Sequence, residues 1–295
     1  MKSIYRIFVA VAAAFTMASC NFLDIVPDEN ATNEDTYSDK SKTERFLYSC
    51  YGYLPQSNIS QSSLDLFTGD EVITAFDHEL FSGFPKGNFT ASTPVISYWD
   101  GFFQGIRQCY MFLEAVDKTP GLDEETKADW RAQGQFLIAY FHYMLARCYG
   151  PIILVNQTPD LETKVEDYAH RVPYDQCVQW ICDKLDAAAA GLPARRDQIQ
   201  YGLATSVAAK AVKAKMLLYA ASPLFNERAP ELFKDMRDPD DGTQLMPTAY
   251  DANKWVKARD AMKEAIDLAE QNGYHLYEKQ DRFIGDASKN QWPEA

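Results

Sequence analysis

The sequence contains none of the common short motifs of catalysis. It has no H-E-x-x-H pair of zinc ligands, no G-x-S-x-G nucleophile turn and no glycine-rich phosphate-binding loop. Its four histidines, His78, His142, His170 and His275, are far apart in the sequence. We therefore expect no catalytic residue, no cofactor and no metal site. A glycosidase pair of carboxylates stays open, because such acids meet in space and not along the chain.

Basic residues are outnumbered by acidic ones, and no two cysteines have the close spacing of a zinc or redox motif. The chain has 29 Lys and Arg against 42 Asp and Glu, a net charge of −13. Binding to a phosphate backbone requires a basic surface, so nucleic acid is excluded as a partner. No C-x-x-C arrangement occurs, which gives no support for a zinc or redox motif. Besides Cys20, five cysteines remain, and we expect them to act as small hydrophobic residues: Cys50, Cys109, Cys148, Cys177 and Cys182.

The longest apolar run stands at the N-terminus. Lys2 and Arg6 flank the start of an almost wholly apolar or small stretch at residues 7–18, which is the build of a secretion signal. A membrane-spanning helix needs about 20 apolar residues, so this run is too short to span a bilayer. Cys20 follows small residues, and the stretch resembles the lipobox at which bacterial lipoproteins are cleaved and acylated. An ordinary signal peptide with an incidental cysteine is the alternative.

The domain boundaries follow from this assignment. We expect residues 1–19 to be a lipoprotein signal peptide and Cys20 to be the lipid-carrying N-terminus of the mature chain. Residues 20–40 are mostly polar and form a tether to the membrane. Residues 41–295 form one helical domain.

Beyond the tether the pattern is helical almost throughout. The predicted helices start at a capping box Ser41-Lys-Thr-Glu44, at Thr93-Pro94, near Asp123, at Pro173, at Thr205 and at Asp251. The third ends at Gly150-Pro151 and is apolar on nearly all sides, so we expect it to be buried among the others. Strand alternation is almost absent. The predicted fold class is mainly α, with antiparallel helix pairs stacked as in tetratricopeptide repeats.

Aromatic residues at helical spacing are assigned to the core. Trp99 and Phe103 belong to one apolar stripe of the second predicted helix, and Phe136 belongs to the third. This spacing indicates packing between helices rather than a platform for a sugar ring.

A long segment of different character separates the first two predicted helices. Residues 55–93 are rich in Gly, Ser, Asn, Phe and Pro, and loops of this length are usually functional or disordered. An aromatic side chain can cover the apolar face of a sugar, while acidic and amide side chains bind its hydroxyls. The candidate ligand-binding residues are Phe67, Asp70, Glu71, Phe81, Phe84 and Asn88. Each phenylalanine has an alternative role, which is to pin the loop to the helices.

Four sequence blocks occur in a characteristic order. They are CNFLDIVP from residue 20, the second helix with Ile106-Arg-Gln and Phe112-Leu-Glu114, FLIAYFHYMLARCYGPIIL at 136–154, and TSVAAKAVKAKMLLYAASPLFN at 205–226. Together they resemble the SusD/RagB family, the lipid-anchored nutrient-binding proteins of Bacteroidetes outer membranes. The resemblance covers nearly all of residues 20–277. Members of that family are usually much longer, so it implies that this chain is the N-terminal portion of such a protein.

Four positions depart from the family pattern. Ile138 and Leu203 stand where arginine is usual, Gln133 stands where glutamate is usual, and Tyr110 stands where asparagine is common. We expect these departures to alter polar contacts inside the helical scaffold.

The resemblance also implies a function. It implies a protein, not an enzyme, that is anchored by lipid in the outer membrane and faces the cell exterior. There it binds a nutrient, in the first place an oligosaccharide, and delivers it to a SusC-like TonB-dependent transporter. Three alternatives stay open: a lipid-anchored glycoside hydrolase, a helical-repeat scaffold that binds only protein, and a peptide-binding protein of the RagB kind.

Overall fold

The computed structural model describes residues 37–55, 69, 80–160, 162–164 and 169–276. Within these residues the chain forms seven α-helices and two short 3-10 helices, and the β pairing consists of an isolated antiparallel bridge between Arg237 and Gln244. The predicted fold class, mainly α, is confirmed. No helix in the described part is both long and apolar enough to cross a bilayer.

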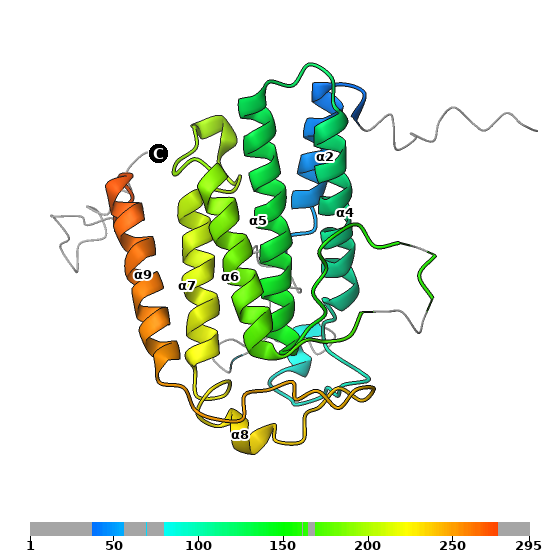
Figure 1. The fold of residues 1–295 in the computed structure, drawn as a ribbon, viewed down its shortest axis with the longest axis vertical. Coiled ribbons are helices and arrows are strands. Elements are labelled where there is room, and N and C mark those ends of the chain that lie inside the picture. Colours follow the sequence, from blue (N-terminus) through cyan, green and yellow to red (C-terminus); the bar gives the residue numbers. More distant parts are fainter. Residues whose placement is uncertain (1–36, 56–68, 70–79, 161, 165–168, 277–295) are drawn as a thin grey trace, which may run out of the picture.

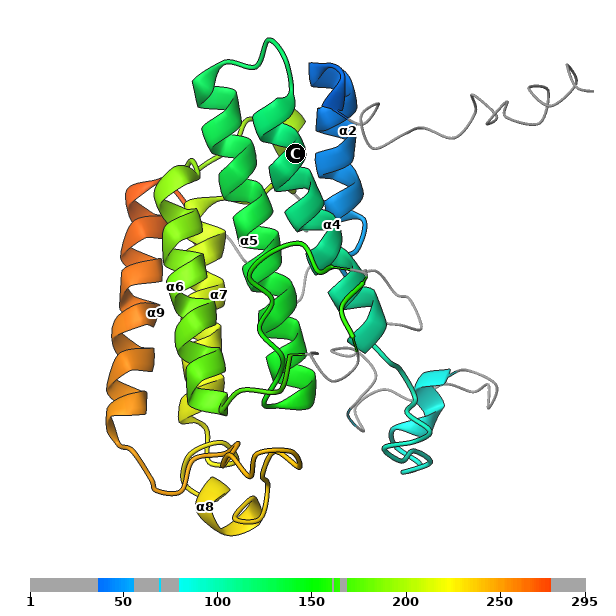
Figure 2. The same cartoon turned by 45° about the vertical axis from the view of Figure 1, so that its right-hand side comes forward.

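Helices that follow one another in sequence pack side by side (Figure 1). The elements are α2 (Lys40–Tyr51), η3 (Leu80–Gly83), α4 (Trp99–Lys118), α5 (Glu124–Tyr149), α6 (Tyr174–Gly191), η5 (Gln198–Gln200), α7 (Ser206–Ala221), α8 (Ala229–Leu232) and α9 (Asn253–Gln271). The contacts run from α4 to α5, then α6, α7 and α9, while α2 covers α4 and part of α5. The result is the predicted stack of antiparallel helices, which Figure 2 shows from a second direction.

The antiparallel order gives the stack two unlike ends. The connections at residues 119–123 and 192–205 lie at one end, at the top of Figure 1. The connections at residues 80–98 and 222–252 lie at the opposite end, together with α8, and the connection between α5 and α6 leaves α5 at that end and runs along α4 over its described residues 150–160. We refer to the second end, made of these three connections, as the long-loop end.

Three helix termini follow the predicted signals. At the start of α5 the Asp123 carboxylate accepts hydrogen bonds from the backbone N–H (2.7 Å) and the hydroxyl (2.8 Å) of Thr126, and these bonds lower the pKa of Asp123. At the start of α7 the Thr205 hydroxyl accepts from the Ala208 N–H at 3.1 Å. Gly150 ends α5 with a φ of 73°, which suits glycine.

The predicted capping box of the first helix is wrong, because the helix starts slightly earlier than Ser41. The cap of α2 is Asp39, whose carboxylate accepts from the Lys42 N–H at 3.0 Å. Ser41 therefore lies inside the helix and not at a capping box. Asp39 has extended backbone angles directly before the first turn, which is the geometry that an N-cap requires.

The predicted start of the second helix is also wrong. α4 begins at Trp99 and not at residue 94. Thr93 forms a separate turn, in which its N–H donates to the Thr90 hydroxyl at 3.0 Å. The Tyr98 N–H donates to the Tyr149 hydroxyl of α5 at 2.9 Å, so a tertiary contact holds the residue at which α4 starts.

α5 is the central helix of the core. Its side chains are buried on nearly all sides, with Phe136, Leu137 and Phe141 each at most 7 % exposed, because α4 packs on one side and α6 on the other. This confirms the prediction for α5 and for Phe136. Trp99 and Phe103 are only partly buried and pack against the edge of the core, so the prediction that they lie inside it is wrong.

Four of the five cysteines considered above are buried as predicted. Burial raises the pKa of Cys177 to about 11 and that of Cys182 to about 12, and Cys50 and Cys109 are buried as well. Thiols with raised pKa values are poor nucleophiles at neutral pH. Cys148 is exposed near the end of α5, so it does not pack as a small hydrophobic residue.

A polar network lies inside the helical stack. Arg196 makes two hydrogen bonds to the Asp129 carboxylate, at 2.9 and 2.7 Å, and its Nε donates to the Ala204 carbonyl at 2.9 Å. Asp129 also accepts from the Gln133 amide at 2.8 Å. The Gln133 oxygen accepts from the Tyr51 hydroxyl at 2.9 Å. The network thus joins α2, α5 and the connection before α7.

The departures from the family pattern have different outcomes. Gln133 takes part in the buried network, and the Tyr110 hydroxyl donates to the Val155 carbonyl at 2.7 Å, so both make polar contacts inside the scaffold. Ile138 is 2 % exposed and packs in the hydrophobic core. At that position the side chain makes apolar contacts inside the scaffold.

Candidate ligand-binding surface

The predicted ligand-binding residues are only partly within the described structure. Phe67, Asp70 and Glu71 lie outside the described residues. Phe81 lies in η3, and its side chain is outside the described part as well. Phe84 and Asn88 follow η3 and are described. The candidate surface is therefore built from these two residues and from what surrounds them at the long-loop end.

The chain between residues 83 and 95 doubles back on itself. Gly87 has a φ of 66°, and its N–H donates to the Phe84 carbonyl at 3.0 Å, which closes a tight turn. A Cβ built on Gly83 would lie 2.9 Å from Cγ2 of Val95, so the two arms touch at this point. A side chain at residue 83 would separate the arms.

Phe84 and Phe89 form an aromatic pair on this turn. Their ring centroids are 5.7 Å apart and their planes are tilted by 59°. Phe84 is partly buried, whereas Phe89 is 49 % exposed and lies next to the exposed Asn88. The turn thus presents an apolar ring beside an amide. The candidates chosen from the sequence include Phe84 and not Phe89, because which ring faces outward depends on how the turn closes.

A second aromatic group stands where α4 begins. The Trp99 ring lies 4.9 Å from Phe103 and 5.2 Å from Tyr149, and the Arg171 guanidinium lies 5.4 Å from the Trp99 ring centroid. Arg171 is exposed and Trp99 is partly buried. Sequence reasoning missed Arg171, since no local pattern relates it to a tryptophan so distant in the chain. The pair combines an aromatic face with a planar hydrogen-bond donor.

A buried histidine ties the 150–173 connection to the helices. Nδ1 of His142 donates to the Ile138 carbonyl (2.7 Å), and Nε2 accepts from the Val155 N–H (3.2 Å). This arrangement requires the neutral ring. Burial lowers the pKa of His142 to about 4, although the bond to Ile138 acts in the opposite direction. His142 therefore positions the loop, and both of its ring nitrogens are already engaged.

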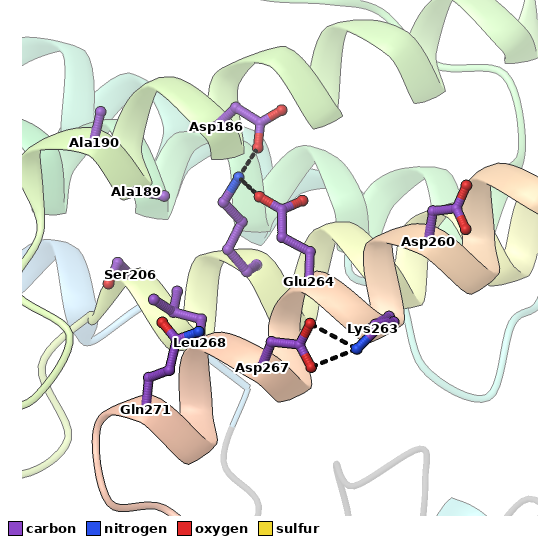
Figure 3. A pocket seen from close by; sticks show the side chains of 11 residues that line it. Asp186, Ala189, Ala190, Ser206, Asp260, Lys263, Glu264, Asp267, Leu268 and Gln271 are labelled. Carbon is purple, nitrogen blue, oxygen red and sulfur yellow. Dashed lines mark hydrogen bonds and ion pairs between the residues drawn. The ribbon is translucent and has the colours of Figure 1, made fainter.

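A groove of about 680 Å³ lies between α6 and α9 (Figure 3). Lys210 of α7 reaches into it and bridges Asp186 of α6 (2.8 Å) and Glu264 of α9 (2.6 Å). Burial by itself raises the pKa of Asp186, but hydrogen bonds from Lys210 and Lys213 outweigh burial and hold that pKa below its ordinary value. The charges in the groove are largely paired with one another.

The side chains that line this groove include no aromatic ring. They are Asp186, Ala189, Ala190, Ser206, Lys210, Asp260, Lys263, Glu264, Asp267, Leu268 and Gln271. A sugar ring would find no apolar platform here. The ion pairs across the groove hold α6, α7 and α9 together. The aromatic turn remains the candidate surface.

Comparisons with known proteins place the chain in a class. The family model described as SusD-like, starch-binding associating with outer membrane, matches residues 21–218. A SusD-like protein of Bacteroides ovatus is 25% identical over 224 residues, which are 74% of this chain and 39% of that protein. The stack of antiparallel helices with long loops at one end is thus the helical part of a SusD-like protein. The chain belongs to the SusD-like family.

Solved structures show the same fold. The protein BT4246 superposes with a TM-score of 0.67 at 34% identity, over 80% of this chain and 41% of that one. A laminarin-binding SusD-like protein superposes with a TM-score of 0.53 at 20% identity, over 68% of this chain and 43% of that one. This chain therefore spans about two-fifths of the length of the relatives it matches.

Proposed function

We propose that this chain is the helical part of a lipid-anchored, cell-surface protein of the outer membrane. It binds an oligosaccharide and delivers it to a SusC-like TonB-dependent transporter, and it catalyses no reaction itself. The observation that carries the proposal is the SusD-like family match over residues 21–218. Similar structures include a laminarin-binding SusD-like protein and a surface glycan-binding protein from Bacteroides uniformis, and they support a glycan as the ligand.

The geometry of the long-loop end supports a site on the turn at residues 83–95. Phe89 offers an exposed ring, and Asn88 offers an amide beside it. Trp99 and Arg171 add an aromatic face and a donor at the start of α4. An aromatic ring covers the C–H face of a sugar, while amide and guanidinium groups bind hydroxyls. Phe67, Asp70, Glu71 and Phe81 remain candidates in the adjoining segment.

The affinity we expect is modest. Phe89 and Asn88 are exposed, so each contact with a ligand stays in competition with water. Ordering loop side chains on binding also opposes association. Modest affinity suits a protein that passes its ligand to a transporter, because delivery requires release.

Affinity electrophoresis of the full chain tests the proposal. We expect migration to be retarded in gels that contain laminarin or starch, and Phe89→Ala and Trp99→Ala to reduce the retardation. Tyr48→Ala is the matched control, because Tyr48 is a similarly exposed aromatic (47 %) on α2, away from the long-loop end. Helical circular dichroism verifies that each variant is folded.

The same preparation distinguishes the alternative functions. Release of reducing sugar from these polysaccharides would support a glycoside hydrolase. Retention of peptides with no retardation by any polysaccharide would support a peptide-binding protein. If retardation is unchanged in both Phe89→Ala and Trp99→Ala, the ligand does not bind at this surface.

A further inference from the structure

Three metal-ligating side chains meet at the long-loop end. Nδ1 of His170 lies 3.1 Å from Oδ2 of Asp240 and 3.8 Å from Oδ1 of Asp238, and one ligand atom from each residue lies within 4.8 Å of the others. His170 belongs to the connection before α6, and the two aspartates belong to the connection between α8 and α9. Segments far apart in the sequence thus bring an imidazole nitrogen and two carboxylates together.

The carboxylates are held by a closed turn. The Asp238 N–H donates to the Thr243 carbonyl at 2.9 Å, and the Gly242 N–H donates to the Asp238 carbonyl at 3.0 Å. Oδ1 of Asp238 accepts from the Asp240 N–H at 2.9 Å, and the Asp238 side chain is only 5 % exposed. The position of this carboxylate is therefore fixed before any ion binds.

The histidine side is joined to the same turn by the backbone. The Val172 N–H donates to the Ile152 carbonyl at 3.0 Å, and the Tyr174 N–H donates to the Leu245 carbonyl at 2.8 Å. The second bond links the start of α6 directly to the residue that follows the isolated bridge of this turn. The separation between His170 and the aspartates is thus set by contacts outside the cluster itself.

The charge balance of the cluster favours a cation. Asp238, Asp240 and Asp241 lie within four residues, and within the described residues no lysine or arginine makes an ion pair with any of them. Arg237, although adjacent, donates to the Gly242 carbonyl instead. A buried carboxylate without a cationic side chain is costly, and a bound divalent ion removes that cost.

We propose that His170, Asp238 and Asp240 bind one zinc ion. Zinc takes imidazole nitrogen at about 2.0–2.1 Å and carboxylate oxygen at about 2.0–2.2 Å, which places tetrahedral ligand atoms about 3.4 Å apart. The separations of 3.1 and 3.8 Å from Nδ1 of His170 lie on either side of that value. Calcium prefers a shell made wholly of oxygen, so the nitrogen ligand selects against it.

The ion acts as a link between two of the long connections. Arg171 directly follows His170, and its guanidinium lies over the Trp99 ring. Zinc binding therefore holds Arg171 in place at the start of α4. The site is separate from the Phe84 and Phe89 turn, and its existence does not depend on which ligand the protein carries.

Zinc binding to the full chain, stripped with a chelator and measured by calorimetry and by metal analysis, tests the proposal. We expect one zinc per chain, with affinity reduced more than about tenfold in His170→Ala and in Asp240→Asn. The matched controls are His275→Ala, an exposed histidine elsewhere, and Asp260→Asn, which changes an exposed aspartate of α9 away from the cluster. Both controls should bind zinc as the wild type does.

The test uses His170 and Asp240 because both are exposed, so their replacement leaves the turn and the fold intact. Circular dichroism of each variant verifies this. Three results would overturn the proposal: no zinc bound by the wild type, equal zinc affinity in the wild type and both ligand variants, or calcium bound in preference to zinc.

Discussion

The guanidinium of Arg196 makes a two-pronged contact with the carboxylate of Asp129, through hydrogen bonds of 2.9 and 2.7 Å. The Arg196 side chain is 4 % exposed and that of Asp129 is 24 % exposed. The pair joins α5 to the connection before α7. Because Arg196 has little access to water, it depends on Asp129 and on the Ala204 carbonyl for its hydrogen bonds.

Breaking this pair should destabilise the protein. We expect Asp129→Ala to lower the free energy of unfolding by about 3 kcal/mol, because it leaves the Arg196 charge buried without its partner. The matched control is Asp117→Ala, which removes the partner of Arg131 in an exposed ion pair and should cost less than about 1 kcal/mol. Urea unfolding measures both. Equal effects of the two changes would mean that the buried Arg196–Asp129 pair contributes no more to stability than the exposed pair does.

Two glycines of α4 should respond to alanine in opposite directions. A Cβ on Gly105 would lie 3.0 Å from Tyr53 Cβ and 3.1 Å from the buried Phe141 ring, neither of which can move freely. Gly105→Ala should therefore cost about 1–3 kcal/mol. Gly101 has open space around its Cβ position, so Gly101→Ala should stabilise by about 0.5–1 kcal/mol through helix propensity. Thermal unfolding of both variants compares the two signs directly.

His142 should make stability depend on pH. Its pKa is lowered to about 4 by burial, against about 6.5 in the unfolded chain, so the folded state holds the neutral ring. The contribution of His142 to the free energy of unfolding is fully present above pH 6.5. It is lost as the pH falls toward 4, by about 1.4 kcal/mol per pH unit. Urea unfolding between pH 5 and 7.5 measures this slope.

Replacement of the histidine isolates its contribution. His142→Gln removes the titrating group, so the slope of stability between pH 5 and 6.5 should flatten. His275→Gln, at an exposed position, should leave the slope unchanged. A slope that persists in His142→Gln would assign the pH dependence to other groups.

Cys20 lies outside the described residues, and its acylation stays a prediction. We expect Cys20→Ala to move the protein from the membrane fraction to the soluble fraction, because each buried methylene of an acyl chain contributes about 0.8 kcal/mol to membrane binding. Intact-mass measurement of the wild type should show the added lipid. Membrane retention of Cys20→Ala, with no lipid on the wild type, would contradict the assignment.

The helices were predictable because their signals are local. The Asp123 and Thr205 caps and the Gly150 terminus each depend on residues within one turn, and each was confirmed. The start of α4 was not predictable, since the Tyr98 amide bonds to the Tyr149 hydroxyl of another helix. The same distinction applies to the candidate surface. Composition singled out the aromatic segment, but only the closed turn decided that Phe89 is the exposed ring.

The sequence by itself determined the mainly α class, the buried character of α5 and the family to which the chain is similar, because periodicity, caps and sequence blocks are read along the chain. Only the tertiary structure decided that Arg196 meets Asp129, that Arg171 lies over Trp99 and that His170 meets Asp238 and Asp240. Each of these contacts joins segments that are distant in sequence. Side-chain convergence of this kind depends on how whole helices pack and where their connections run, and no local pattern encodes it.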